Sequence, residues 1–295
     1  FFFKQKTAYE IYQCDWSSDV CSSDLMSNAS VPVVHEVQIV DELGRSKSTF
    51  IPGERSLTIY LDKREVVTLM TLGSAPEALV LGYLRNQRLV ESADDIESIQ
   101  VDWETDSAAV KTRRNTVDID AITSKRVVTT GCGQGTIFGG LMEDMAQIRL
   151  PDGPKLNQIA IVDLLDQIRT HETIYKKAGS VHACAVFERL GEDKVKLIHL
   201  IEDVGRHNAV DSISGLMWLA KRRGADLIFF TTGRLTSEMV IKGAQMGIPF
   251  LLTRSGVTQM GLELARKTNL TLLSRCSGKH FEIYNAPERV VFQTA

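Results

Sequence analysis

LIFFTTGRLTSEMVIKGAQMGIPFLLT, residues 227–253, is the stretch that decides the fold class. Two short apolar runs, Leu227 to Thr231 and Phe250 to Thr253, lie on either side of a helical segment from Ser237 to Met246. A strand, a helix and a second strand in this order are joined by a right-handed crossover, which makes the two strands parallel. The stretch therefore predicts one strand-helix-strand unit of a parallel sheet.

The same alternation continues on both sides of this unit. A strand that ends at Ile201 and a helix from Asn208 to Arg223 precede it, and a helix from Gln259 to Lys267 and a strand from Leu270 to Ser274 follow it. Upstream we expect, in chain order, a strand at 126–130, a helix at 159–175 and a hairpin of strands 181–189 and 194–201. The fold class predicted for residues 126–295 is α/β, with a mixed, largely parallel sheet and flanking helices.

Residues 31–125 have a different pattern, which predicts a small α+β domain. Apolar residues from Leu57 to Leu61 alternate with polar ones ahead of a β-branched run at 66–68, which indicates a hairpin. Ser74-Ala75-Pro76-Glu77 is typical of a helix start, because it supplies a capping Ser, a Pro for the first turn and a Glu three residues after the Ser. Two short strands near 99–103 and 108–112 complete the domain, and the polar stretch 112–125 predicts its boundary.

The composition excludes several classes of protein. The 295-residue chain has a formal net charge of −3 and so lacks the basic field of a general nucleic-acid binder. No apolar run reaches the roughly 18 to 20 residues that span a bilayer. Residues 1–25 are rich in aromatic side chains, have no helical or strand periodicity and resemble a translated sequencing adapter, so we treat 1–30 as a leader. The remaining cysteines are Cys132, Cys184 and Cys276, an odd number that indicates reduced thiols and a cytoplasmic protein.

Four successive predicted strands are each followed by a loop that contains an arginine. These arginines are Arg206, Arg234, Arg254 and Arg275, with glycine and usually serine or threonine nearby. In an open parallel sheet such loops gather at the carboxyl ends of the strands, where ligands bind. Guanidinium groups, hydroxyls and helix N-termini together suit phosphate oxygens. The pattern favours an anionic-ligand site over the alternative that all four are solvated loop residues.

Cys132 is the candidate nucleophile. It lies between Gly131 and Gly133 at a strand end, and a helix start near Thr136 would favour its thiolate. The alternative is a small buried hydrophobe. Cys184, within the apolar run 182–186, is expected to fill core space, whereas Cys276 could either contact a ligand or pack.

Other motifs point away from nucleotide-loop and zinc chemistry. The turn at 131–136 is neither G-x-G-x-x-G nor a P-loop, and the chain has no C-x-x-C pair, so a zinc deaminase centre is not expected. Three of the six histidines, His182, His207 and His280, lie near the candidate loops, and His207 is the best acid/base candidate.

Four segments also resemble the FdhD/NarQ family of formate dehydrogenase accessory sulfurtransferases. These segments are YKKAGSVHACAVF (175–187), EDVGRHNAVD (202–211), TGRLTSEMVIKGAQMGIP (232–249) and Gly131-Cys132-Gly133, and the similarity covers about residues 35–286. The resemblance implies a small N-terminal domain and a C-terminal domain of the cytidine deaminase-like fold without its zinc. It also implies that sulfur, accepted as a cysteine persulfide from a cysteine desulfurase, passes to the bis-molybdopterin guanine dinucleotide cofactor of formate dehydrogenase.

The resemblance assigns roles to individual positions. Cys132 matches the cysteine that carries the persulfide, while Gly135 stands where the family usually has the second cysteine of C-x-x-C. Residues implied in binding the molybdenum cofactor are Arg275, Cys276, Ser277, Gly278, Lys279 and His280, together with Arg206, His207, Arg234, Ser237 and Arg254. Guanine nucleotide is the expected surrogate ligand, and no metal is expected to bind directly to the protein.

Two functions stay open at this point. In the first, Cys132 alone transfers sulfur; in the second, suggested by Gly135, the chain is a non-catalytic chaperone that only binds the cofactor. Expected partners are a cysteine desulfurase, formate dehydrogenase and the molybdenum cofactor, but neither nucleic acid nor a membrane, and a homodimer is one option for its assembly.

Overall fold

The computed structural model describes residues 27, 29–113, 127–128, 135–136, 145, 147–191 and 193–293. Its N-terminal part is a four-stranded sheet in the order β4-β3-β6-β5, with one helix, α2, packed on it. The elements are β1 (Val34–Val40), β2 (Ser46–Pro52), β3 (Arg55–Leu61), β4 (Arg64–Thr71), α2 (Pro76–Asn86), β5 (Ile96–Asp102) and β6 (Ser107–Thr112). The predicted hairpin, helix and two strands are all confirmed.

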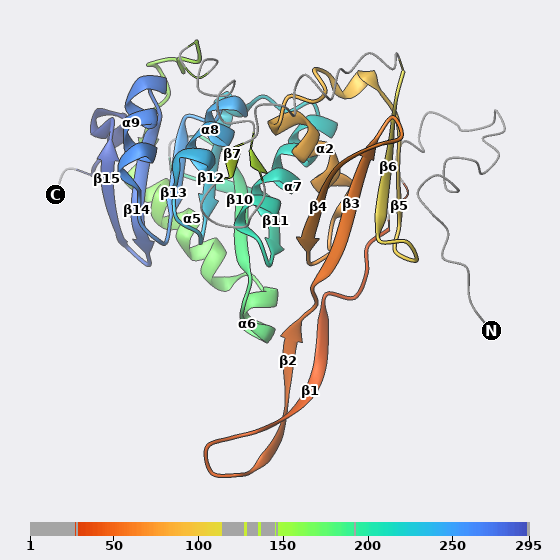
Figure 1. Cartoon of the computed structure of the whole chain (residues 1–295). Helices are drawn as coiled ribbons and strands as arrows, with labels where there is room; N and C mark the ends of the chain where they lie inside the picture. The colour runs from red at the N-terminus through yellow and green to blue at the C-terminus, as the bar shows by residue number, and fades with distance from the viewer. Residues whose placement is uncertain are drawn as a thin grey trace, which may run out of the picture.

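The β1–β2 hairpin was not predicted. It projects from the body of the molecule below the four-stranded sheet (Figure 1), and none of residues 34–52 is buried. Because it has no buried apolar face, it lacks the clear alternation by which half-buried strands are recognised.

The C-terminal part is built on a six-stranded sheet in the order β11-β10-β12-β13-β14-β15. Its strands are β10 (His182–Arg189), β11 (Val195–Asp203), β12 (Leu227–Thr231), β13 (Phe250–Thr253), β14 (Thr271–Ser277) and β15 (His280–Asn285). Its helices are α5 (Gln158–Thr170), α6 (Ile174–Ala178), α7 (Arg206–Leu219), α8 (Ser237–Gln245) and α9 (Gln259–Thr268). The short strands are β7 (Val127–Val128), β8 (Gly135–Thr136), β9 (Leu156–Asn157) and β16 (Val290–Val291). Single turns of 3-10 helix in the described ranges are Ala93–Asp95, Gly224–Asp226 and Pro287–Arg289.

Helices cover both faces of this sheet. Apolar residues of α7, α8 and α9 form one core with one face, and those of α5 form a second core with the other (Figure 1). α7 also packs against α2, which joins the two sheets. No helix in the described ranges is long and apolar enough to cross a bilayer.

Three expectations about this part of the chain are corrected. β10 lies between β11 and β12 and is antiparallel to both, so within this six-stranded sheet parallel ladders join only β12 to β13 and β13 to β14. The strand expected to end at Ser274 continues to Ser277 and turns back into β15, with Arg275 in the left-handed region at φ 55 within a bulge. The helix expected over 159–175 is two helices, α5 and α6.

The division between α5 and α6 has a local cause. The chain becomes extended at His171, and the side chain of Thr173 accepts a hydrogen bond from Lys176 N, which caps a new helix. Apolar spacing alone continues through the break and does not reveal it. The predicted boundary at 112–125 and the leader lie largely outside the described residues, so the domain division stays a prediction.

Candidate functional site

β11, β12, β13 and β14 point in the same direction, so their carboxyl ends share one edge of the sheet. Backbone hydrogen bonds join the loops that follow them. Leu235 N donates to Gly256 O at 3.0 Å, and Arg275 N donates to Ser255 O at 3.0 Å. The predicted gathering of the arginine-bearing segments at this edge is therefore confirmed.

The four arginines differ in how accessible they are. Arg234, Arg254 and Arg275 are exposed, and the guanidinium of Arg275 lies beside Gly256. Arg206 is buried, and its stem packs on Gly233, where an added Cβ would lie 3.0 Å from Arg206 Cδ. Three of the arginines are thus placed to meet a ligand from solvent.

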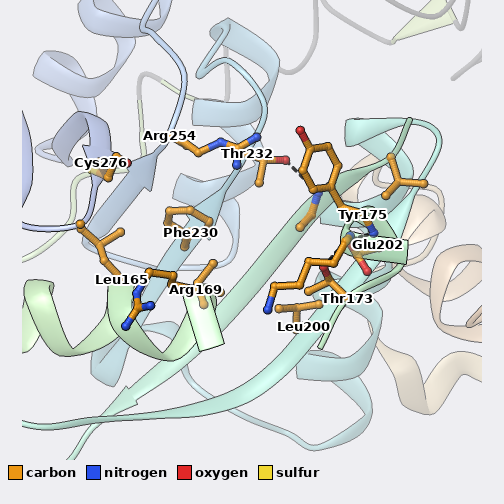
Figure 2. A pocket seen from close by; sticks show the side chains of 16 residues that line it. Leu165, Arg169, Thr173, Tyr175, Leu200, Glu202, Phe230, Thr232, Arg254 and Cys276 are labelled. Atoms are coloured by element: carbon orange, nitrogen blue, oxygen red, sulfur yellow. Dashed lines mark hydrogen bonds between the residues drawn. The ribbon is translucent and has the colours of Figure 1, made fainter. Parts of the chain in front are cut away.

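A cavity of about 260 Å³ opens at this edge, on the face of the sheet that α5 covers (Figure 2). Four of the residues predicted for cofactor binding line it: Arg254, Cys276, Ser277 and Gly278. The others, Arg206, His207, Arg234, Ser237, Arg275, Lys279 and His280, do not line it. One side of the cavity is thus formed by residues at the ends of neighbouring strands.

The opposite side comes from α5, α6 and the segment between them. Arg169, Thr173, Tyr175 and Lys176 line the cavity there, and none of them was predicted as a site residue. The floor is apolar, with Leu165, Leu200 and Phe230 among its residues, while Arg169, Lys176 and Arg254 supply positive charge. An apolar floor with cations around it suits a ligand that has a flat ring and an anionic group.

Glu202 holds α6 in its place beside the cavity. Its carboxylate accepts hydrogen bonds from the backbone N–H of Ile174, at 2.5 Å, and of Tyr175, at 3.1 Å. Burial raises the pKa of Glu202, and these two N–H donors oppose that rise. Arg254 extends towards the ring of Tyr175, with its Cζ 5.3 Å from the ring centroid (Figure 2). Glu202 therefore fixes the start of α6, and the exposed ring of Tyr175 contacts Arg254 on the opposite wall of the cavity.

Asp203 has a structural role within the EDVGRHN segment. Its carboxylate accepts hydrogen bonds from Thr71 Oγ1 at 2.6 Å and Leu72 N at 3.1 Å, both at the end of β4. It also accepts from Gly205 N at 3.0 Å and Asn208 Nδ2 at 2.9 Å at the start of α7. Asp203 thus joins the N-terminal sheet to the loop that precedes Arg206.

The two described cysteines are both buried. Cys184 packs in the core between the sheet and α7, as predicted, and burial raises the pKa of its thiol to about 12. Cys276 lines the cavity although it is only 1% exposed, and burial likewise raises its pKa to about 12. Both thiols are protonated near neutral pH. Cys132 lies outside the described residues.

The acid/base role predicted for His207 is not supported. This side chain is buried at the start of α7, with Nε2 3.2 Å from Glu238 Oε2, and it does not line the cavity. Burial above all, with help from the nearby Lys242 charge, lowers the pKa of His207 to about 3. The imidazole is therefore neutral and a very weak base near pH 7.

These features define a mixed α/β protein whose cavity, at the carboxyl edge of the larger sheet, suits an anionic ligand with a flat ring. Residues 52–291 match the model of the FdhD/NarQ family, and the chain belongs to that family.

Similar proteins agree with this assignment. The chain is 26% identical over 237 residues to the sulfur carrier protein FdhD of Wolinella succinogenes, covering 80% of this chain and 81% of that one. It is 27% identical over 240 residues to the protein of the same name from Staphylococcus aureus, covering 81% and 88%. A crystal structure of a candidate formate dehydrogenase accessory protein from Desulfotalea psychrophila has the same fold, with a TM-score of 0.69 and 24% identity over 88% of this chain and 100% of that one.

Proposed function

We propose that the chain is a sulfur carrier that accepts sulfur from a cysteine desulfurase and passes it to the bis-molybdopterin guanine dinucleotide cofactor of formate dehydrogenase. Family membership and the named function of the relatives support the sulfur-carrier role. The order of strands and helices from β10 to β14 supports a cytidine deaminase-like fold for the C-terminal part.

The observation that carries this proposal is the composition of the cavity. Arg254 and the segment 276–278 come from separate strand ends and converge on one cavity, where Arg169 and Lys176 add positive charge from the opposite side. We assign the guanine nucleotide end of the cofactor to this cavity, because its floor can cover a ring while guanidinium and ammonium groups bind phosphate.

The rest of this large cofactor would extend along the edge of the sheet. The residues proposed to contact it are Arg234, Ser237, Arg275, Lys279 and His280, of which Arg234, Arg275, Lys279 and His280 are exposed. Buried Arg206 and His207 would act by shaping the start of α7.

The proposed sulfur chemistry begins at Cys132. Its thiolate attacks the outer sulfur of the donor persulfide, a new sulfur-sulfur bond forms, and the desulfurase cysteine leaves as a thiolate. Release of that sulfur to the cofactor as sulfide needs two electrons. Because Gly135 occupies the second cysteine position, we assign these electrons to an external thiol, which forms a disulfide with Cys132 as the sulfide leaves.

The test is intact-mass measurement after incubation with a cysteine desulfurase and cysteine. The wild-type chain should gain one sulfur atom, a reducing agent should remove it, and Cys132→Ser should not gain it. Binding of GDP, measured by calorimetry, is the second readout. If GDP binds but no sulfur is gained, the sulfur-transfer proposal is wrong and the chaperone alternative, which Gly135 favours, is supported.

A further inference from the structure

α6 is too short to be stable as a helix without contacts to other parts of the chain. Isolated helices below roughly 12 to 15 residues are marginal in water, and α6 has 5 residues. Extended backbone at His171 precedes it, and Gly179 and Ser180, both at positive φ, follow it. Its place beside the cavity must therefore come from contacts with other parts of the chain.

Glu202 provides the first of these contacts. It is only 5% exposed, and its carboxylate accepts the first two backbone N–H groups of α6, those of Ile174 and Tyr175. These donors have no partner within the helix itself, so the carboxylate satisfies them. This contact fixes the start of α6 to the end of β11.

The β1–β2 hairpin provides the second contact. α6 packs against β2, and the two lie side by side in Figure 1. The ammonium of Lys177 lies over the ring of Phe50, 4.3 Å from its centroid, which is the geometry of a cation–π contact. Phe50 itself does not line the cavity, whereas Glu202 does.

Neither partner in this contact has a core of its own. None of residues 34–52 is buried, and no residue of α6 is buried either. A lone two-stranded hairpin is marginally stable in water, so each element depends on the other. Tyr175 and Lys176, which line the cavity, lie directly before Lys177 in the chain.

We propose that Phe50 and Glu202 are positioning residues that together hold α6 as the outer wall of the cavity, so that the β1–β2 hairpin supports ligand binding without touching the ligand. This inference rests on the proposed function for the identity of the ligand. The fixing of α6 itself does not depend on that ligand.

The binding experiment uses GDP as the probe, with calorimetry on the full chain. Phe50→Ala and Glu202→Gln should each weaken binding by about three- to tenfold, the effect of losing one contact of this type. Phe50→Tyr should restore binding, because it keeps a ring under Lys177. Ile51→Ala is the matched control, since Ile51 is the next residue, is 45% exposed and faces the other side of the ribbon.

The double variant tests whether both residues act through α6. If they do, Phe50→Ala combined with Glu202→Gln should weaken binding by clearly less than the product of the two single effects, since the wall is already released by one change. Independent, multiplying effects would overturn the proposal. So would unchanged binding in Phe50→Ala.

Hydrogen exchange of the α6 amides separates this inference from the proposed function. Phe50→Ala and Glu202→Gln should each speed exchange at 174–178 in the absence of ligand, while Ile51→Ala should not. If the wild-type chain fails to bind GDP, the ligand assignment is wrong, but faster exchange would still support the positioning roles. Unchanged exchange in both variants would refute them whatever GDP does.

Discussion

A substitution at Gly82 tests how closely the two halves of the molecule are packed. Gly82 lies in α2 where this helix crosses α7, and an added Cβ would lie 1.7 Å from Asp211 O and 2.7 Å from Gly215 N. Contacts this short do not occur, so Gly82→Ala must push the helices apart. The same movement would break the 2.6 Å hydrogen bond from Asn86 Nδ2 to Asp211 Oδ1, which is buried at this crossing.

The cost can be worked out from these contacts. Forcing extra volume into a packed interface costs about 1–3 kcal/mol, and a buried partner left without its hydrogen bond costs about 1–3 kcal/mol. Alanine returns about 1 kcal/mol of helix propensity relative to glycine. We expect a net loss of about 3 kcal/mol in the free energy of unfolding. At about 2–4 °C per kcal/mol for a chain of this size, Tm should fall by about 6–12 °C.

Urea denaturation and thermal melting followed by circular dichroism measure this loss. Gly153→Ala is the control, because Gly153 has no left-handed φ and an added Cβ there meets nothing within 4 Å. That variant should melt within about 1 °C of the wild type. A Gly82→Ala protein that melts like the control would show that α2 and α7 do not approach as closely as described.

Three further predictions concern ionisable side chains. Arg254→Ala should weaken GDP binding in calorimetry roughly ten- to hundredfold, because one charge-assisted contact is lost. Arg234 does not line the cavity, so Arg234→Ala should change the affinity for GDP less than about twofold. Equal losses in the two variants would contradict the placement of the nucleotide. Lys242 Nζ lies 2.8 Å from Asp211 Oδ1, and both side chains are buried. Lys242→Met leaves this carboxylate without its cation, so the free energy of unfolding measured in urea should fall by about 3–5 kcal/mol. A loss below about 1 kcal/mol would argue against a buried pair. The pKa of His207 is about 3 in the folded chain against an ordinary 6.5, so between these values only the unfolded chain takes up the proton. The free energy of unfolding of the wild type should therefore fall, relative to that of His207→Gln, by up to about 1.4 kcal/mol per pH unit below about 6.5. Parallel pH profiles of unfolding free energy in the two proteins would contradict this.

The sequence predicted the fold best where a single physical signal dominated. Residues 227–253 form the expected strand, helix and strand, because buried parallel strands leave short apolar runs that stand out. The insertion of β10 between β11 and β12 was missed, since hairpin partners give no sign of what pairs with their other edge. The bulge at Arg275 was missed because arginine has no preference for positive φ that a pattern could register.

The candidate site was predicted on one side only. Strand ends are recognisable in sequence, so Arg254 and the segment 276–278 could be placed together in advance. Tyr175 and Lys176 line the cavity because the helix breaks before them and Glu202 holds the start of α6. Neither the break nor the contact with Glu202 leaves a periodic pattern in the sequence. The signal that could have found them is Thr173, a capping residue inside an apparently continuous helical pattern.

The place of β10 also sets the spacing of positive charge along the edge. Neighbouring strands lie about 4.8 Å apart, so inserting β10 separates the segments that follow β11 and β12 by about 10 Å instead of 5. His182, the first residue of β10, lies in this gap, and the pKa of its imidazole is lowered by burial and by the charges of Arg206 and Arg234. An anion bound to the exposed Arg234 would offset part of that repulsion and favour the imidazolium. Ligand binding at this point of the edge would then be accompanied by uptake of a proton from solvent.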